Sequence, residues 1–245
     1  MTPRILLAVS RRVLTQLRRD RRTAAMLLVL PCVVMTLLWW MFQDLPGSLF
    51  DRFGPALLAM FPFIVMFLVT SVTTLRERSS GTLERLLAMP LGKLDFLGGY
   101  AVAFGVVAAV QAALAVALSV GLLGLEVDGP VLMLGIVAVA DAVLGTALGL
   151  FVSAFARTEF QAVQFMPLFV IPQILLCGLF VPRSSLPDVL HAASDVLPLS
   201  YATDAMQTLV STPATGDVWR DLGVVLAFTL ACLALGAATL RRRTP

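Results

Sequence analysis

Six long apolar runs, separated by shorter polar stretches, dominate the hydrophobic pattern of the chain. They cover residues 24–42, 54–75, 96–125, 131–155, 162–180 and 222–240. About 20 apolar helical residues are enough to cross the hydrocarbon core of a bilayer. Because lipid offers the backbone no hydrogen-bond partners, runs of this length are expected to be helices. The pattern therefore predicts an all-α membrane protein with six transmembrane helices.

The stretch before the first run has a different pattern. Ile5, Val9 and Val13 recur every four residues, and arginines occupy positions between them. On a helix this spacing separates an apolar face from a basic face. We expect residues 1–23 to form a cytoplasmic amphipathic helix on the membrane surface, followed by a transmembrane domain over 24–245. The alternative is an unstructured basic leader that only fixes the topology.

Residues 181–221, between the fifth and sixth runs, are long for a simple loop. Ser185 followed by Asp188 has the pattern of a helix start, with the serine as N-cap and the aspartate in the first turn. Pro198 is expected to end that helix, and Ser200 to cap a second one. We predict two short helices that rest at the outer face or dip into it.

Composition and charge support a lipid environment and set an orientation. Hydrophobic residues make up 59% of the chain and charged residues 13%, with a mean hydropathy of +0.93. A soluble domain carries roughly 25% charged residues. Six crossings place both termini on one side, and 15 of the 18 Lys and Arg residues lie on that side. The positive-inside rule predicts that both termini are cytoplasmic in a multi-pass protein of the cell membrane.

A charged segment between the second and third runs carries candidate docking residues. Gly81 suits an N-cap, a carboxylate at Glu84 favours the helix dipole, and Pro90 ends the helix. Exposed leucines bordered by charges usually mark a docking surface. We predict a short helix over 81–89 that contacts a partner; the alternative is a helix packed on the membrane surface. The candidate contact residues are Arg76, Glu77, Arg78, Gly81, Thr82, Leu83, Glu84, Arg85, Leu86 and Leu87.

Polar residues inside the spans form a second set of candidates. Asp141, Gly145, Gly149 and Ser153 follow each other at four-residue spacing and share one helix face. Small residues allow close helix approach, and an intramembrane carboxyl is a functional candidate by default. Asp141 either lies on a transport path or is structural, protonated or bonded to a neighbouring span. The amides Gln111, Gln164 and Gln173 are expected to link helices.

Motifs for chemistry within the chain are not evident. Gly92 and Lys93 are followed by Leu94 and lack the glycine that a phosphate-binding loop requires. His191, the single histidine, and the three cysteines, which all lie in apolar runs, suggest neither a metal site nor a catalytic one. Any energy source is therefore expected on another polypeptide.

Two segments carry a resemblance to a known family. The sequence Arg-Glu-Arg-x-x-Gly-Thr-Leu-Glu-Arg-Leu-Leu-x-Met-Pro-Leu, over 76–91, resembles the membrane subunits of ABC type-2 exporters, particularly the daunorubicin and antibiotic-resistance permeases. The segment from Gly178 to Pro182, continued from Leu197 to Ala205, is similar to that family's region between the last two spans. The six-span layout and the basic leader extend the resemblance over the whole chain.

The resemblance implies a permease subunit that exports an amphipathic drug, antibiotic or lipid-like substrate by alternating access. It implies two separate cytoplasmic ABC ATPase subunits, which hold ATP and Mg²⁺, a second permease subunit in a homodimer or heterodimer, and no nucleic acid. Residues 81–89 would then be the coupling helix. An ATP-independent secondary transporter or channel, and less readily an intramembrane enzyme, remain as alternatives. The substrate stays open.

Overall fold

The fold is taken from a computed structural model that describes residues 3–43, 49–80 and 93–239. Within these ranges the regular structure is helical and includes no strand. In chain order the elements are α1 (Pro3–Arg19), α2 (Arg21–Phe42), α3 (Leu49–Ser79), α5 (Lys93–Gly121), α6 (Val131–Ser153), α7 (Glu159–Leu176), the 3₁₀ turn η1 (Arg183–Ser185), α8 (Asp188–Asp195), α9 (Pro198–Ser211) and α10 (Gly216–Thr239).

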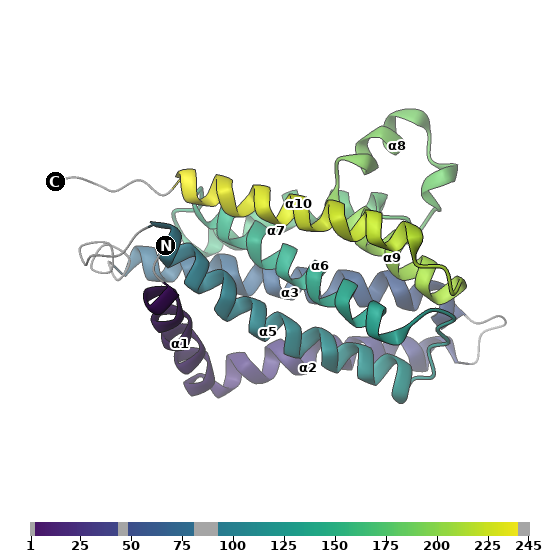
Figure 1. Cartoon of the computed structure of the whole chain (residues 1–245), viewed down its shortest axis with the longest axis horizontal. Helices are drawn as coiled ribbons and strands as arrows, with labels where there is room; N and C mark the ends of the chain where they lie inside the picture. Colours follow the sequence, from purple (N-terminus) through teal and green to yellow (C-terminus); the bar gives the residue numbers. More distant parts are fainter. Residues whose placement is uncertain (1–2, 44–48, 81–92, 240–245) are drawn as a thin grey trace.

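Six of the described helices are long and apolar enough to cross a membrane, namely α2, α3, α5, α6, α7 and α10. They run alongside one another as a bundle (Figure 1). The predicted all-α membrane fold with six spans is therefore confirmed. One end of the bundle, the α1 end, holds α1, the end of α3, the start of α5 and the end of α10; the opposite end, the α8 end, holds α8 and α9 (Figure 1).

Helix α6 forms the centre of the bundle. It contacts α3, α5 and α10, and most of its side chains are buried. By contrast, few residues of α2 and α7 are buried, and exposed apolar side chains on them include Val33, Leu37, Leu168 and Leu175. Apolar surface of that extent is suited to contact with lipid rather than water.

Helix α1 is a separate element whose axis turns sharply from that of α2 (Figure 1). The break is at Asp20, whose carboxylate accepts hydrogen bonds from the backbone N–H and the hydroxyl of Thr23, at 3.2 and 2.6 Å. This N-cap starts α2, and the hydrogen bonds lower the pKa of Asp20. The helix expected over residues 1–23 thus ends at Arg19, and residues 21–23 belong to α2.

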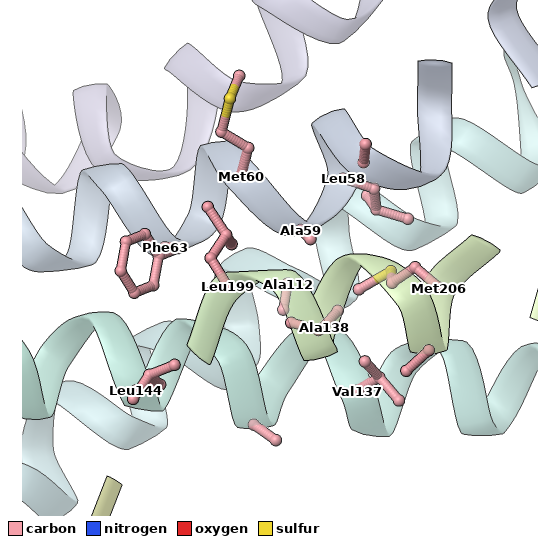
Figure 2. Packing of buried hydrophobic residues seen from close by; sticks show 14 of the residues in the cluster. Leu58, Ala59, Met60, Phe63, Ala112, Val137, Ala138, Leu144, Leu199 and Met206 are labelled. Carbon is pink, nitrogen blue, oxygen red and sulfur yellow. The ribbon is translucent and has the colours of Figure 1, made fainter. Parts of the chain in front are cut away.

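Helix α9 lies inside the bundle and contacts both α3 and α6. Figure 2 shows α9, which carries Leu199 and Met206, between α3, which carries Phe63, and α6, which carries Val137. These four side chains belong to one buried cluster. A segment predicted at the outer face therefore contributes to the core.

The helix starts predicted in this region were partly wrong. Asp188 does lie in the first turn of α8, but Pro187 occupies the N-cap position and Ser185 lies in η1. Pro198 begins α9 rather than preceding its cap, so Ser200 lies inside the helix. Proline is favoured at the first helical position, because its missing N–H would have no intrahelical partner there.

Several span boundaries also differ from the apolar runs. Helix α5 ends at Gly121 although the run continues to 125, and α7 ends at Leu176 although its run continues to 180. After α7, Gly178 has a φ of 93°, a left-handed conformation that favours glycine and interrupts a helix. Conversely, α10 begins at Gly216 with a polar turn that hydropathy does not detect.

Candidate functional site

An ion pair joins α1 to the last turns of α3. Nη2 of Arg12 donates to both carboxylate oxygens of Glu77, at 3.1 and 3.3 Å. The Glu77 side chain is 7% exposed, whereas that of Arg12 is 37% exposed. A hydrogen-bonded charge pair of this kind is stronger than a neutral hydrogen bond. It therefore ties the movement of α1 to that of α3.

Close packing holds the other face of α1 against α5. Val9 and Val13 are buried, and a Cβ added at Gly99 of α5 would lie only 2.6 Å from the Cβ of Val9. A side chain at position 99 would therefore push the two helices apart. The glycine seats α1 directly on α5, so α1 bridges the end of α3 and the start of α5.

A second ion pair links α3 to the start of α7. Nε and Nη2 of Arg76 each donate to a carboxylate oxygen of Glu159, both at 3.0 Å. Both side chains are exposed, so the pair stabilises the fold little. Its geometry nevertheless places two neighbouring residues of α3, Arg76 and Glu77, in contact with two different helices.

A cavity of about 430 Å³ lies among these elements. It is lined by polar and aliphatic side chains from α1 and α3, by polar groups around the start of α2, and by the aromatic side chains of Tyr100 and Phe104 from α5. Arg12 and Glu77 form part of its wall. The α1 end of the bundle is thus a junction of α1, α3 and α5, with the start of α2 beside it, around an open space.

The segment that follows this junction in the chain contains most of the predicted docking residues. Gly81, Thr82, Leu83, Glu84, Arg85, Leu86 and Leu87 lie outside the residues that the structure describes, as does the side chain of Arg78. Of the predicted contact residues, the structure places the side chains of Arg76 and Glu77. Both stand in ion pairs at the end of α3.

The small-residue face of α6 lies against α3. A Cβ at Gly145 would lie 2.4 Å from the carbonyl oxygen of Phe63, and one at Gly149 would lie 2.5 Å from that of Phe67. The hydroxyl of Ser153 donates to its own helix, at the carbonyl of Leu150, at 2.7 Å. Only glycine allows the two backbones to approach this closely.

Asp141 begins this face of α6 and is fully buried. Neither of its carboxylate oxygens has a hydrogen-bond partner among the described residues. It is not brought together with the junction at the α1 end, which is built from α1, α3 and α5. The structure thus places Asp141 in the packed interior and gives it no partner that would explain it.

The three candidate glutamines have three different environments. Gln173 of α7 accepts a hydrogen bond from the backbone N–H of Leu199, at 3.3 Å, and donates to the carbonyl of Phe169, at 2.9 Å. It therefore anchors the first turn of α9 to α7. Gln111 of α5 is fully buried without a hydrogen-bond partner among the described residues, and Gln164 of α7 is exposed.

Sequence reasoning missed a polar cluster at the α8 end. The guanidinium of Arg183 is 12% exposed; it pairs with Asp204 and, at 2.6 Å, with Asp195. It also donates to the hydroxyl of Ser194, at 3.0 Å, and lies over the ring of Tyr201. Burial raises the pKa of Asp204, and the charge and hydrogen bond of Arg183 oppose that rise. One arginine thus fastens η1, α8 and α9 together.

The sequence does contain an indirect indication of this cluster, namely Arg183 itself. Arg183 is one of only three basic residues assigned by sequence to the outer side, and a cation in such an apolar stretch requires partners. Those partners lie 12 and 21 residues further along the chain. Only the fold brings them together.

Comparison with known proteins gives consistent matches. The family described as ABC-2 type transporter matches residues 4–210. The "Probable multidrug ABC transporter permease YbhR" of Escherichia coli is 30% identical over 190 residues, which cover 77% of this chain and 52% of that protein. The linearmycin resistance permease protein LnrN of Bacillus subtilis is 24% identical over 185 residues, 73% of this chain and 48% of LnrN. The chain thus spans about half the length of these relatives.

Proposed function

The chain belongs to the ABC-2 type transporter family, and from this premise we propose that it is the permease subunit of an ATP-driven exporter. The observation that carries the proposal is the junction at the α1 end. There Arg12 and Glu77 fasten α1 to α3, directly before the charged, leucine-bearing segment 81–89 in the chain. A force applied to that segment would reach three helices at once.

In the proposed orientation the α1 end faces the cytoplasm of the cell membrane. Most arginines of α1, together with Arg76 and Lys93, belong to that end, whereas Arg183 and Arg220 belong to the α8 end. The positive-inside rule supports this assignment. The basic face of α1 would then contact the anionic headgroups of the inner leaflet.

The proposed complex contains two ABC ATPase subunits and a second permease subunit, identical or related. ATP and Mg²⁺ would bind to the ATPases, and this chain would transmit their movement. The exposed apolar faces of α2 and α7 offer surface for lipid and for the second permease subunit. Whether the pair is a homodimer or a heterodimer is left to measurement of the intact complex.

The proposed mechanism is alternating access. Closure of the ATPases would push segment 81–89, and α1, α3 and α5 would move together because the ion pair and the close contact at Gly99 join them. The relatives named for multidrug transport and linearmycin resistance support an amphipathic drug, antibiotic or lipid-like substrate. If the helices can pack in two alternative arrangements, this push would switch the substrate site from facing the cytoplasm to facing the outside.

The proposal is tested by recovery of an ATPase with the tagged chain. Burial of one leucine contributes roughly 1.5–3 kcal/mol, and about 1.4 kcal/mol is tenfold in affinity. Leu83→Asp is therefore expected to lower ATPase recovery at least about tenfold, and Glu84→Arg to reduce substrate-stimulated hydrolysis. Leu190→Asp, an exposed leucine of α8 at the opposite end, is the matched control. Unchanged recovery and hydrolysis in both test variants would refute the docking role of segment 81–89.

A further inference from the structure

A second cavity, of about 460 Å³, opens at the α8 end. Its walls come from η1, the end of α8, the polar face of α9 and the first turns of α10. Gln207, Thr208 and Ser211 of α9 give one wall hydroxyl and amide groups. Its volume falls in the range of small-molecule sites. The cavity is separate from the junction at the α1 end.

The cavity has an acidic lining. Four carboxylates, from Asp195, Asp204, Asp217 and Asp221, face two guanidinium groups, from Arg183 and Arg220. The formal balance is therefore minus two. Arg183 is already paired with Asp195 and Asp204, so its charge is compensated within the wall. One of the two excess negative charges belongs to the Arg183 cluster, and the other belongs to the first turns of α10, where Asp217 and Asp221 accompany Arg220.

Asp221 shows that this charge is not accounted for by the fold. Its side chain lines the cavity, is only 9% exposed and makes no hydrogen bond or ion pair with any described residue. Its charged neighbours are two further carboxylates, Asp204 and Asp217, and two guanidinium groups, Arg220 and Arg183, neither of which forms an ion pair with it. A buried carboxylate normally has a partner. Asp221 therefore points to a positively charged group that enters the cavity from outside the chain.

We propose that this cavity binds the ammonium group of an organic cation, with Asp221 and Asp217 as its carboxylate partners. The assignment rests on the proposed transport function and makes the cavity an outer site for the charged end of an amphipathic substrate. A metal ion is a poorer fit, because no three His, Cys, Asp or Glu side chains among the described residues are grouped to hold one. An ammonium needs only nearby carboxylates and a polar wall, and both are present.

The test is binding of benzyltrimethylammonium to the full chain in nanodiscs of zwitterionic lipid, measured by equilibrium dialysis. Benzyl alcohol, which is neutral, and benzenesulfonate, which is anionic, are the comparison probes. We expect the cation alone to bind saturably, with an affinity that falls as salt is added, because screening weakens exposed charge pairs. Equal binding of the three probes, or no saturable binding of the cation, would overturn the proposal.

Single substitutions test whether the cation binds at Asp221 and Asp217. Asp221→Asn removes the charge without changing the side-chain shape and is expected to weaken cation binding about tenfold, equivalent to about 1.4 kcal/mol. Asp217→Asn, at an exposed position in the first turn of α10, is expected to weaken it about two- to fivefold. Asp188→Asn is the matched control, since this exposed aspartate of α8 lies outside the cavity. Unchanged binding in Asp221→Asn and Asp217→Asn, or an equal loss in Asp188→Asn, would contradict the assignment.

This experiment fails independently of the proposed function, since it uses the chain without an ATPase. If the ATPase is recovered with the chain but no cation binds, the exporter assignment stands and the outer site does not. If the cation binds through Asp221 and no ATPase is recovered, the site stands and the exporter assignment falls.

Discussion

The Arg12–Glu77 ion pair allows an asymmetric prediction. Arg12→Gln leaves the Glu77 carboxylate, 7% exposed, without its cation. Glu77→Gln leaves an Arg12 side chain that is 37% exposed, although its Nη1 atom is enclosed. Removal of one partner of a buried pair is strongly destabilising because the other charge stays buried. We therefore expect Arg12→Gln to cost about 2–3 kcal/mol and Glu77→Gln about 0.5–1 kcal/mol.

The assay is thermal unfolding of the purified chain in one detergent, with both single variants and the double variant. For a chain of this size about 1 kcal/mol corresponds to roughly 2–4 °C in Tm. Arg12→Gln should lower Tm by about 4–12 °C. The double variant should regain most of that loss, because no charge is then left unpaired. Thr15→Ala, on the exposed face of α1, controls for changes in the helix itself.

Equal effects of the two single variants would refute the burial argument. Additive effects in the double variant would show that the two side chains do not interact. If the double variant does show that the two side chains interact, the single variants should also be measured in the assembled complex. There we expect ATP hydrolysis to continue while export falls, because α1 would no longer move together with α3.

Three further predictions follow from particular positions. In a chain freed of its three native cysteines, Asp188→Cys should react with an impermeant thiol reagent outside intact cells and Ser79→Cys should not; the reverse labelling would invert the topology. Asp141→Asn should keep most transport, while Asp141→Leu should lower assembly; selective loss of cationic substrates in a well-assembled Asn variant would instead place Asp141 on the transport path. Gly145→Ala should cost about 1–3 kcal/mol by overpacking against the backbone of α3, whereas Gly135→Ala on the same helix meets nothing within 4 Å; similar Tm values would show that α3 and α6 can separate freely.

The class of fold could be predicted from the sequence because the hydropathy of a long helix indicates whether its surroundings are lipid or water. Six apolar runs gave six spans, since each must satisfy its own backbone in lipid. Helix ends were harder to predict. The run to residue 180 is apolar throughout, yet Gly178 adopts a left-handed conformation and α7 ends at Leu176. Hydropathy does not encode backbone torsion.

The sites were predicted less completely because they depend on contacts between distant residues. Arg12 belonged to a basic face expected at the membrane surface, and only the fold shows Glu77 within reach of it. The Arg183 cluster and the unpaired Asp221 also arise from tertiary packing of η1, α8, α9 and α10. Motifs predicted the family, whereas pairings across the bundle needed coordinates.

Reconstitution in proteoliposomes measures which energy source drives transport through this chain. The chain would be incorporated with and without the ATPase recovered with it, and export of a fluorescent amphiphile would be followed under ATP or under an imposed proton gradient. We expect transport only when the ATPase and ATP are both present, and we expect Leu83→Asp to abolish that transport. Transport driven by the proton gradient with this chain alone would contradict it.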